Sequence, residues 1–204
     1  MVDWDEHAAG WDENAAVREY AAAAFEALGG QLAARGLALA DLRVLDFGCG
    51  TGLLSESLAS VCKEVVALDP SEKMIAVLRE KIERAGWNHV HAIAQTLQGA
   101  LEGDRLRPPF DLVVCSSVCA FLDDYPGTAR QLADLLGPGG VYLQFDWERD
   151  DSEDEPYGLA REEIVAALTD ARLEGVRVDV AFKRDVEGHA MQPLLGIGQR
   201  PPTG

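Results

Sequence analysis

The chain has 204 residues, which is long enough for one globular domain. Its composition, 48% hydrophobic and 26% charged, excludes a disordered or fibrous protein. Lys and Arg number 18 against 35 Asp and Glu, which gives a net charge of −17. Proteins bind nucleic acids and anionic membranes through Lys and Arg side chains. This balance therefore predicts no nucleic-acid partner and no membrane partner, and it favours a small-molecule substrate.

The predicted elements alternate between helices and short buried strands. An Ala-rich helix is expected over 14–28, and helical spacing recurs around 53–61, 74–82 and 129–136. Between these lie apolar strands at 43–47, 64–68, 90–94, 111–115 and 141–145. Continuously apolar strands that alternate with helices predict a mostly parallel sheet covered on both faces, the doubly wound α/β fold.

The carboxyl-terminal third has a different pattern. An acidic run over 148–155, read as a solvated loop that would also attract a cationic acceptor, precedes a helix at about 161–172. Two further strands, 176–182 and 190–198, predict an antiparallel hairpin at the sheet edge. We expect a single domain over 1–204, with a helical amino-terminal segment at 1–40 and the core at 41–200.

The first strand runs into the sequence VLDFGCGTG. Glycines at 48, 50 and 52 allow a sharp turn and leave N–H groups exposed at the start of a helix. A dinucleotide fingerprint counted from Gly48 requires glycine where Leu53 stands, which disfavours a nicotinamide-dependent oxidoreductase. Asp46 places a carboxylate beside the loop, which suits a cationic ligand better than a pyrophosphate.

A second acid, Asp69, follows the next strand. Neighbouring strand ends converge on the crevice where such folds bind ligands, so an acid here can accept hydrogen bonds from both hydroxyls of a ribose. Taken alone, an Asp before Pro70 equally indicates a turn or a helix cap. Together with the glycine loop it predicts a nucleoside site.

From Leu42 to about Arg200 the chain resembles the class I S-adenosylmethionine-dependent methyltransferases of the small bacterial kind. The matching segments are VLDFGCGTG, VVALDPSEKM, FDLVVCSSVCAFLDD, LADLLGPGGVYLQFDWE and LLGIG. The leading WDEHAAGWDENAAVREYA also resembles the family's cap over the cofactor. The resemblance implies a Rossmann-like, seven-stranded sheet, S-adenosylmethionine as cofactor and S-adenosylhomocysteine as product.

The resemblance also implies cofactor contacts. The loop of Gly48, Cys49, Gly50 and Gly52 would pass under the methionine part, with Asp46 near its amino group, and Asp69 would hold the ribose hydroxyls. The other implied contacts are Pro70 and Met74 at the adenine, Thr96 at the adenine amine in place of the family's usual acid, and Cys115 and Ser116 opposite the loop.

On the acceptor side, the resemblance and the positions of the aromatic residues imply a pocket lined by Trp11, Tyr20, Phe121 and Trp147. Many relatives carry a His-His pair where this chain has Ala120 and Phe121, which indicates a different acceptor or transfer without an imidazole. Positioning the acceptor in line suffices for transfer, and a base is needed only when the acceptor must lose a proton. The candidates for a catalytic role are His7, Tyr20, Asp146 and Trp147.

These roles have simpler alternatives. His7 as a solvated histidine, and the leading aromatic residues as a staple for the first helix, account for the sequence as well. Cys115 and Cys119 have no third ligand nearby, so no metal is predicted. Four cysteines without a C-x-x-C pair, and an amino terminus without a signal peptide or apolar span, predict a cytoplasmic location.

The sequence thus predicts transfer of a methyl group to a small-molecule acceptor. Two alternatives stay open: a protein that binds the cofactor without transfer, as a regulatory or partner subunit, and a protein methyltransferase. The acceptor atom is not specified by the sequence. Monomer and homodimer are both open, since an edge hairpin can pair across a two-fold axis.

Overall fold

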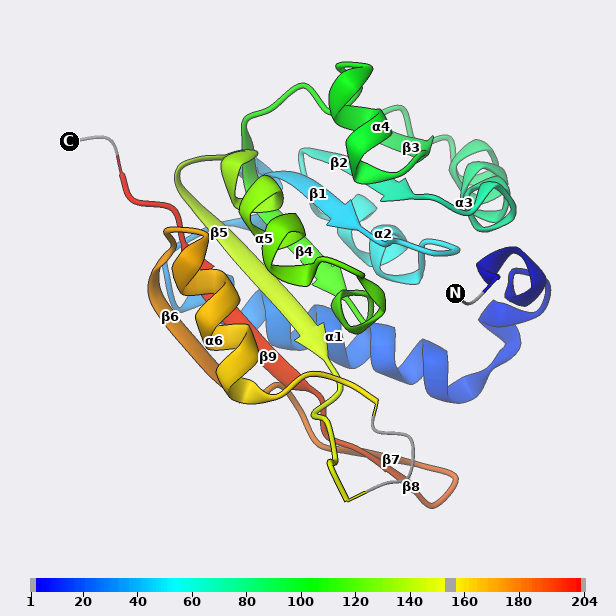
Figure 1. Cartoon of the computed structure of the whole chain (residues 1–204). Coiled ribbons are helices and arrows are strands. Elements are labelled where there is room, and N and C mark those ends of the chain that lie inside the picture. The colour runs from blue at the N-terminus through cyan, green and yellow to red at the C-terminus, as the bar shows by residue number, and fades with distance from the viewer. Residues whose placement is uncertain (1–2, 153–156, 203–204) are drawn as a thin grey trace. The chain divides into compact units, whose positions relative to one another are not determined.

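The computed structural model describes residues 3–152 and 157–202 and falls into two compact units, 1–107 and 108–204. The predicted fold class is confirmed: the sheet is seven-stranded and mostly parallel, and it ends in an antiparallel pair. The first unit supplies three strands and the second supplies four (Figure 1). In the described ranges, no helix is both long and apolar enough to cross a membrane.

The first unit is built on β1 (Arg43–Phe47), β2 (Glu64–Asp69) and β3 (Val90–Ala94). All three run parallel in the order β3-β2-β1, close to the predicted bounds. In the register, Phe47 pairs with Leu68. The residues that follow β1 and β2 therefore emerge at the same edge, which places the glycine loop beside Asp69.

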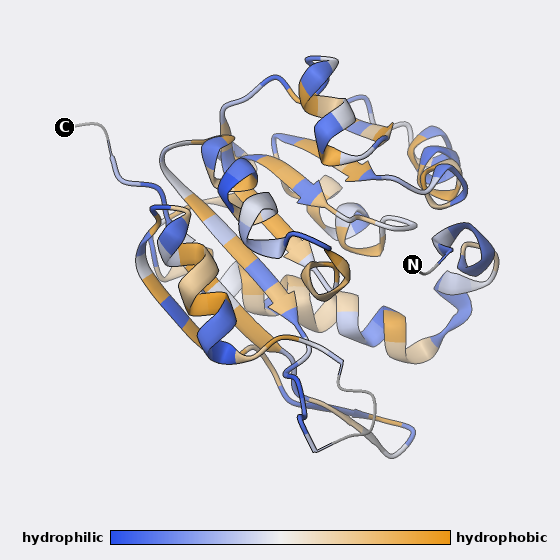
Figure 2. Ribbon diagram, in the orientation of Figure 1, coloured by the Kyte–Doolittle hydropathy of each residue, from blue (hydrophilic) through white to orange (hydrophobic). Residues whose placement is uncertain are grey.

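The described residues of the first unit also form four α-helices and three 3-10 turns. They are α1 (Ala15–Ala33), α2 (Leu53–Ala59), α3 (Glu72–Ala85) and α4 (Leu97–Glu102), with 3-10 turns η1 (Trp4–His7), η2 (Trp11–Glu13) and η3 (Leu39–Asp41). Helix α1 extends past the predicted end at residue 28, because buried Leu28 and Leu32 continue its packing across Gly29 and Gly30. Helix α3 buries Ile75 and Leu78 against Ala67 and turns its charged side outward (Figure 2).

The second unit is built on β4 (Phe110–Ser116), β5 (Leu136–Asp146), β6 (Glu174–Val180) and β9 (Leu194–Gln199), in the order β4-β5-β9-β6. Strands β4 and β5 are parallel, and β9 is antiparallel to β5 and β6. Strand β5 begins five residues before its predicted start, because the register shifts between Phe110 and Leu112 and accommodates the Gly-rich stretch. A side chain at Gly140 would meet the carbonyls of Gly137 and Phe110, so this turn requires glycine.

The predicted edge hairpin is confirmed as β6 and β9, but its connection differs from the expectation. A separate ribbon, β7 (Arg184–Val186) and β8 (His189–Met191), lies between them, so a single strand over 190–198 was wrong. The break falls at Pro193, which has no N–H to donate to a ladder. The remaining elements are η4 (Cys119–Phe121), α5 (Tyr125–Asp134) and α6 (Arg161–Asp170). Part of the acidic run, 153–156, lies outside the described residues.

Candidate functional site

A tight glycine turn leaves the end of β1 and leads into α2 (Figure 1). Gly48, Gly50 and Gly52 all have positive φ angles, of 70°, 54° and 85°. The N–H of Gly48 donates to the Leu68 carbonyl at 2.8 Å, which ties the turn to β2. A Cβ on Gly50 would point into open space, so at that position the turn leaves its backbone accessible to a ligand.

Asp69 connects this turn to the segment after β2. One carboxylate oxygen accepts from the Gly50 N–H at 2.9 Å, and the other accepts from the Ser71 N–H at 2.9 Å. The side chain is buried, and burial raises its pKa against the two hydrogen bonds, which lower it. Each carboxylate oxygen has a second lone pair, so Asp69 can still accept hydrogen bonds from a ligand.

Asp46 lies under the loop and is 1% exposed. Its Oδ2 accepts from the Ser55 hydroxyl at 2.5 Å, while its Oδ1 is buried without a hydrogen-bond partner in the described part of the chain. Burial raises the pKa of Asp46 to about 7 and also raises that of the neighbouring Cys49 thiol. A buried acceptor without a donor is costly, and a cationic donor would satisfy it.

The amino-terminal segment is bound to the glycine turn through Asp12. Its Oδ1 accepts from the Thr51 hydroxyl at 2.6 Å, and its Oδ2 lies 2.7 Å from the Lys81 ammonium. Lys81 is only 7% exposed and also contacts Glu56 of α2 at 2.6 Å. One buried cation therefore joins the amino-terminal segment, α2 and α3.

A second contact of this segment lies next to Asp69. The Asp5 carboxylate accepts from the Ser71 hydroxyl at 2.5 Å and from the Lys73 N–H at 3.3 Å. The hydrogen bond from Ser71 lowers the pKa of Asp5. Asp5 and Asp12 thus fix residues 3–14 over the residues that the sequence predicts to hold the cofactor.

Three aromatic rings of the leading segment contact one another. The ring centroids of Trp4 and Trp11 are 6.0 Å apart and nearly perpendicular, and His7 lies 5.8 Å from Trp4 and 6.4 Å from Trp11. His7 is exposed, Trp4 and Trp11 are half-buried, and Tyr20 is buried in α1. The two predicted uses of the aromatic residues, as a roof over the cofactor and as a staple for the first helix, stay predictions.

The remaining predicted cofactor residues of the first unit differ in exposure. Met74 is buried and its N–H donates to the Ser71 hydroxyl at 3.1 Å, while Pro70 is exposed. The Thr96 hydroxyl accepts from the Gly99 N–H at 3.1 Å. Thr96 therefore caps α4, a role that the sequence prediction did not include.

The second unit holds a buried polar network at the ends of β4 and β5. Cys115 lies 3.3 Å from the Tyr142 hydroxyl, and the Tyr125 hydroxyl donates to Gln144 at 2.7 Å. Gln144 in turn donates to Asp146 Oδ2 at 3.2 Å. Asp146 is fully buried, and burial raises its pKa to about 7 and is the largest cause of a raised pKa at the Cys119 thiol.

Asp146 also contacts the turn that follows β4. Its Oδ1 accepts from the Ala120 N–H at 3.3 Å and so fixes the turn that presents Phe121. Phe121 and Tyr157 are 38% and 39% exposed, with ring centroids 5.3 Å apart. Ser116 and Trp147 are half-buried. An exposed aromatic pair thus stands beside a buried acid.

Sequence reasoning named Asp46, the glycine loop and Asp69, which the structure brings together in the first unit. It missed Asp12 and Lys81, whose roles depend on contacts between distant segments, and it missed Ser55, which donates to Asp46. A local signal was available only for Ser55, since position 55 lies on the first turns of the helix after the loop. Tyr157 follows the acidic run and carried no signal.

Comparison with known proteins gives a consistent result. The methyltransferase domain family matches residues 45–142. The chain is 36% identical over 108 residues to a ubiquinone biosynthesis O-methyltransferase of Aromatoleum aromaticum, a match covering 52% of this chain and 44% of that protein. It is 36% identical over 103 residues to an uncharacterized methyltransferase of Schizosaccharomyces pombe, covering 48% of this chain and 36% of that protein. The chain thus spans less than half the length of both relatives.

Solved structures agree on the fold. The N-methyltransferase NodS of Bradyrhizobium japonicum, in complex with S-adenosylhomocysteine, superposes with a TM-score of 0.67 at 21% identity, over 93% of this chain and 90% of that one. The magnesium protoporphyrin IX methyltransferase of Synechocystis, with bound S-adenosylhomocysteine, gives a TM-score of 0.66 at 21% identity, over 86% of this chain and 81% of that one.

Proposed function

We propose that this chain, whose residues 45–142 match the methyltransferase domain family, is a class I S-adenosylmethionine-dependent methyltransferase that transfers a methyl group to a small-molecule acceptor. The observation that carries the proposal is the glycine turn held by Asp69 above a buried Asp46 oxygen that accepts no hydrogen bond from the described residues. Both acids fit the cofactor, since Asp46 can accept from an ammonium group and Asp69 from ribose hydroxyls.

The chain's own residues bind and orient the two reactants. Gly50 and Asp69 form one wall of the cofactor site, and Asp12 and Asp5 keep the leading segment over it. When bound, S-adenosylmethionine supplies an electrophilic methyl group on a sulfonium. A sulfonium centre is favoured by aromatic faces, which the Trp4 and Trp11 pair offers.

We infer that residues of the second unit contact the acceptor. Phe121, Tyr157 and Trp147 supply apolar contact area, and the buried Asp146 acts as a positioning residue for the turn that carries Phe121. The names of the curated relatives make oxygen the first acceptor atom to test. None of the four cysteines is in a disulfide, which supports the predicted cytoplasmic compartment.

The first experiment is calorimetric titration with S-adenosylmethionine, S-adenosylhomocysteine and NAD, followed by screening of phenolic, amine and thiol acceptors for S-adenosylhomocysteine release. We expect micromolar binding of both adenosyl ligands, no binding of NAD, and turnover with a small acceptor. Binding without turnover on any acceptor, including protein lysates, would support the cofactor-binding alternative. Turnover confined to proteins would support a protein methyltransferase.

The raised pKa of Asp46 predicts a pH dependence of cofactor binding. A cationic amino group needs the ionised acid, so S-adenosylhomocysteine affinity should fall by up to about tenfold per pH unit below 7 and level off above it.

The folded state holds this proton between the ordinary pKa of 3.8 and about 7, so the Asp46 contribution to stability falls as pH rises through that window. Binding near pH 6.5 should release a proton, measurable from calorimetry in buffers of different ionisation enthalpy.

Two variants isolate this effect. Asp46→Asn should weaken binding and abolish its pH dependence, whereas Asp146→Asn should keep it, although the pKa of Asp146 is also about 7. An equal slope in wild type and Asp46→Asn contradicts the placement of the amino group.

A further inference from the structure

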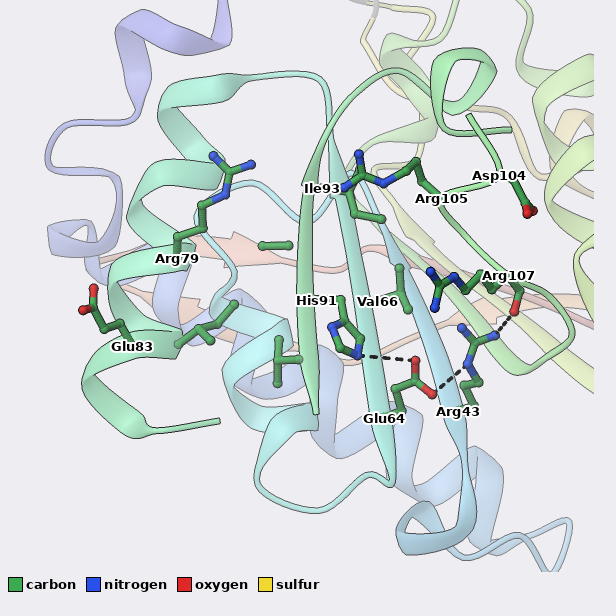
Figure 3. A pocket seen from close by; sticks show the side chains of 13 residues that line it. Arg43, Glu64, Val66, Arg79, Glu83, His91, Ile93, Asp104, Arg105 and Arg107 are labelled. Atoms are coloured by element: carbon green, nitrogen blue, oxygen red, sulfur yellow. Dashed lines mark hydrogen bonds and ion pairs between the residues drawn. The ribbon is translucent and has the colours of Figure 1, made fainter. Parts of the chain in front are cut away.

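The first unit has a pocket of about 510 Å³ around its edge strand β3 (Figure 3). Val66 and Ile93, which are 2% and 6% exposed, lie at its floor, half-buried Ile82 and Ala92 add apolar area, and the turn over 104–107 forms a wall. None of its lining residues belongs to the glycine turn, and neither Asp46 nor Asp69 reaches it. It is therefore distinct from the proposed cofactor site, and binding of a ligand there does not depend on the proposed function.

The pocket reaches around the edge strand to Ile82 and Glu83 of α3, and on the other sheet face it lies where the cover is incomplete. Val66 pairs with His91 in the register, so Val66, His91 and Ile93 share one face, while Ala67 and Ala92 face α3. Helix α4 ends at Glu102 after six residues, and the chain turns back at once. The His91 side chain is left 53% exposed.

The wall of this pocket is fixed by Arg43. Its guanidinium donates to the Leu106 carbonyl at 3.0 Å and also to the Arg107 carbonyl, while its Nε donates to Glu64 at 2.8 Å. Arg107 has a positive φ of 51°, which only a minority of residues other than glycine adopt. These contacts hold the Arg105 and Arg107 segment against β1.

Positive charge collects here although the whole chain carries −17. Glu64 contacts Arg43 through one oxygen and lies 3.6 Å from His91 through the other. Arg105 and Arg107 form no ion pair with any described residue, and Figure 3 shows both pointing toward the strands. In the same view Glu83 and Asp104 point away from them. The guanidiniums of Arg105 and Arg107 are thus available to an anion.

We propose that this pocket binds a small organic anion, with its carboxylate, sulfonate or phosphate group on Arg105 and Arg107 and its apolar body on Val66 and Ile93. Guanidinium groups match the geometry of such oxyanions and form bidentate, charge-assisted hydrogen bonds with them. The volume lies within the range of small-molecule sites. The apolar floor selects an amphipathic anion over an inorganic one.

The test is fluorescence titration with anilinonaphthalene sulfonate, an aromatic anion, in the presence of excess S-adenosylhomocysteine to occupy the proposed cofactor site. Arg105→Gln combined with Arg107→Gln should weaken binding at least about tenfold, since each lost charge-assisted hydrogen bond contributes more than a neutral one. The matched control is Arg84→Gln with Arg130→Gln, which removes the same charge from exposed positions outside the pocket. The control should bind like wild type.

Hydrogen exchange with the bound dye should protect 90–94 and 104–107. Inorganic phosphate should compete at least about tenfold more weakly than the dye, because it lacks an apolar body. Equal dye affinity in the two double variants, protection confined to other segments, or phosphate binding as tight as dye binding would each overturn the proposal. Cofactor affinity, titrated separately, reports on the proposed function alone.

Discussion

Replacing Asp69 by alanine should weaken S-adenosylhomocysteine binding by about 1–3 kcal/mol and lower the free energy of unfolding by a similar amount. The affinity loss follows from the proposed ribose contacts. The stability loss follows from the structure, because the N–H groups of Gly50 and Ser71 each lose their carboxylate acceptor. Calorimetric titration and urea unfolding measure the two quantities independently.

The matched variant is Asp69→Asn. Its amide oxygen can still accept from one of the two backbone N–H groups, so stability should fall less than in Asp69→Ala. Its affinity should remain low, because an amide accepts hydroxyl hydrogen bonds more weakly than a carboxylate. If Asp69→Ala unfolds more easily but binds S-adenosylhomocysteine like wild type, Asp69 only supports the turn, and the ribose lies elsewhere.

Much of the fold follows from local patterns. The strands at 43–47 and 90–94 were predicted at their observed bounds, because buried parallel strands are short apolar runs followed by turn residues. The start of β5 could not be predicted in this way, since Gly137 to Gly140 indicates a turn and enters the strand only through its pairing with β4. The ribbon of β7 and β8 is equally a matter of pairing, with three residues in each strand.

Some residues of the candidate site could be predicted from local position, and others could not. The roles of Asp46, Gly50 and Asp69 follow from their position at strand ends, where the fold itself brings them together. The role of Asp12 depends on where an amino-terminal turn meets α3, which no local pattern encodes. Thr96 was expected at the cofactor because the family resemblance implies an adenine contact at this position, and its observed bond to Gly99 is the ordinary chemistry of a helix cap.

The contact of Lys81 with Asp12 and Glu56 is expected to have a large effect on stability. Lys81→Met should lower the free energy of unfolding by about 1–3 kcal/mol, because it leaves the carboxylates of Asp12 and Glu56 facing each other without a cation. Removing one partner of a fully buried pair typically costs more, but both acids are about a third exposed, at 30% and 34%. Hydrogen exchange over residues 3–14 should accelerate, and S-adenosylhomocysteine binding should weaken.

Two comparisons separate this role from a general defect in α3. Arg79→Met removes a cation from the same helix, but its pair with Glu72 is exposed at both ends, so the change should stay within about 0.5 kcal/mol. Adding Glu56→Gln to Lys81→Met should restore part of the stability, since it removes one of the two facing charges. If the double variant is less stable than Lys81→Met alone, like-charge repulsion is not the cause. In that case the lost contacts of the Lys81 ammonium with Asp12 and Glu56, and not repulsion between the two acids, account for the loss.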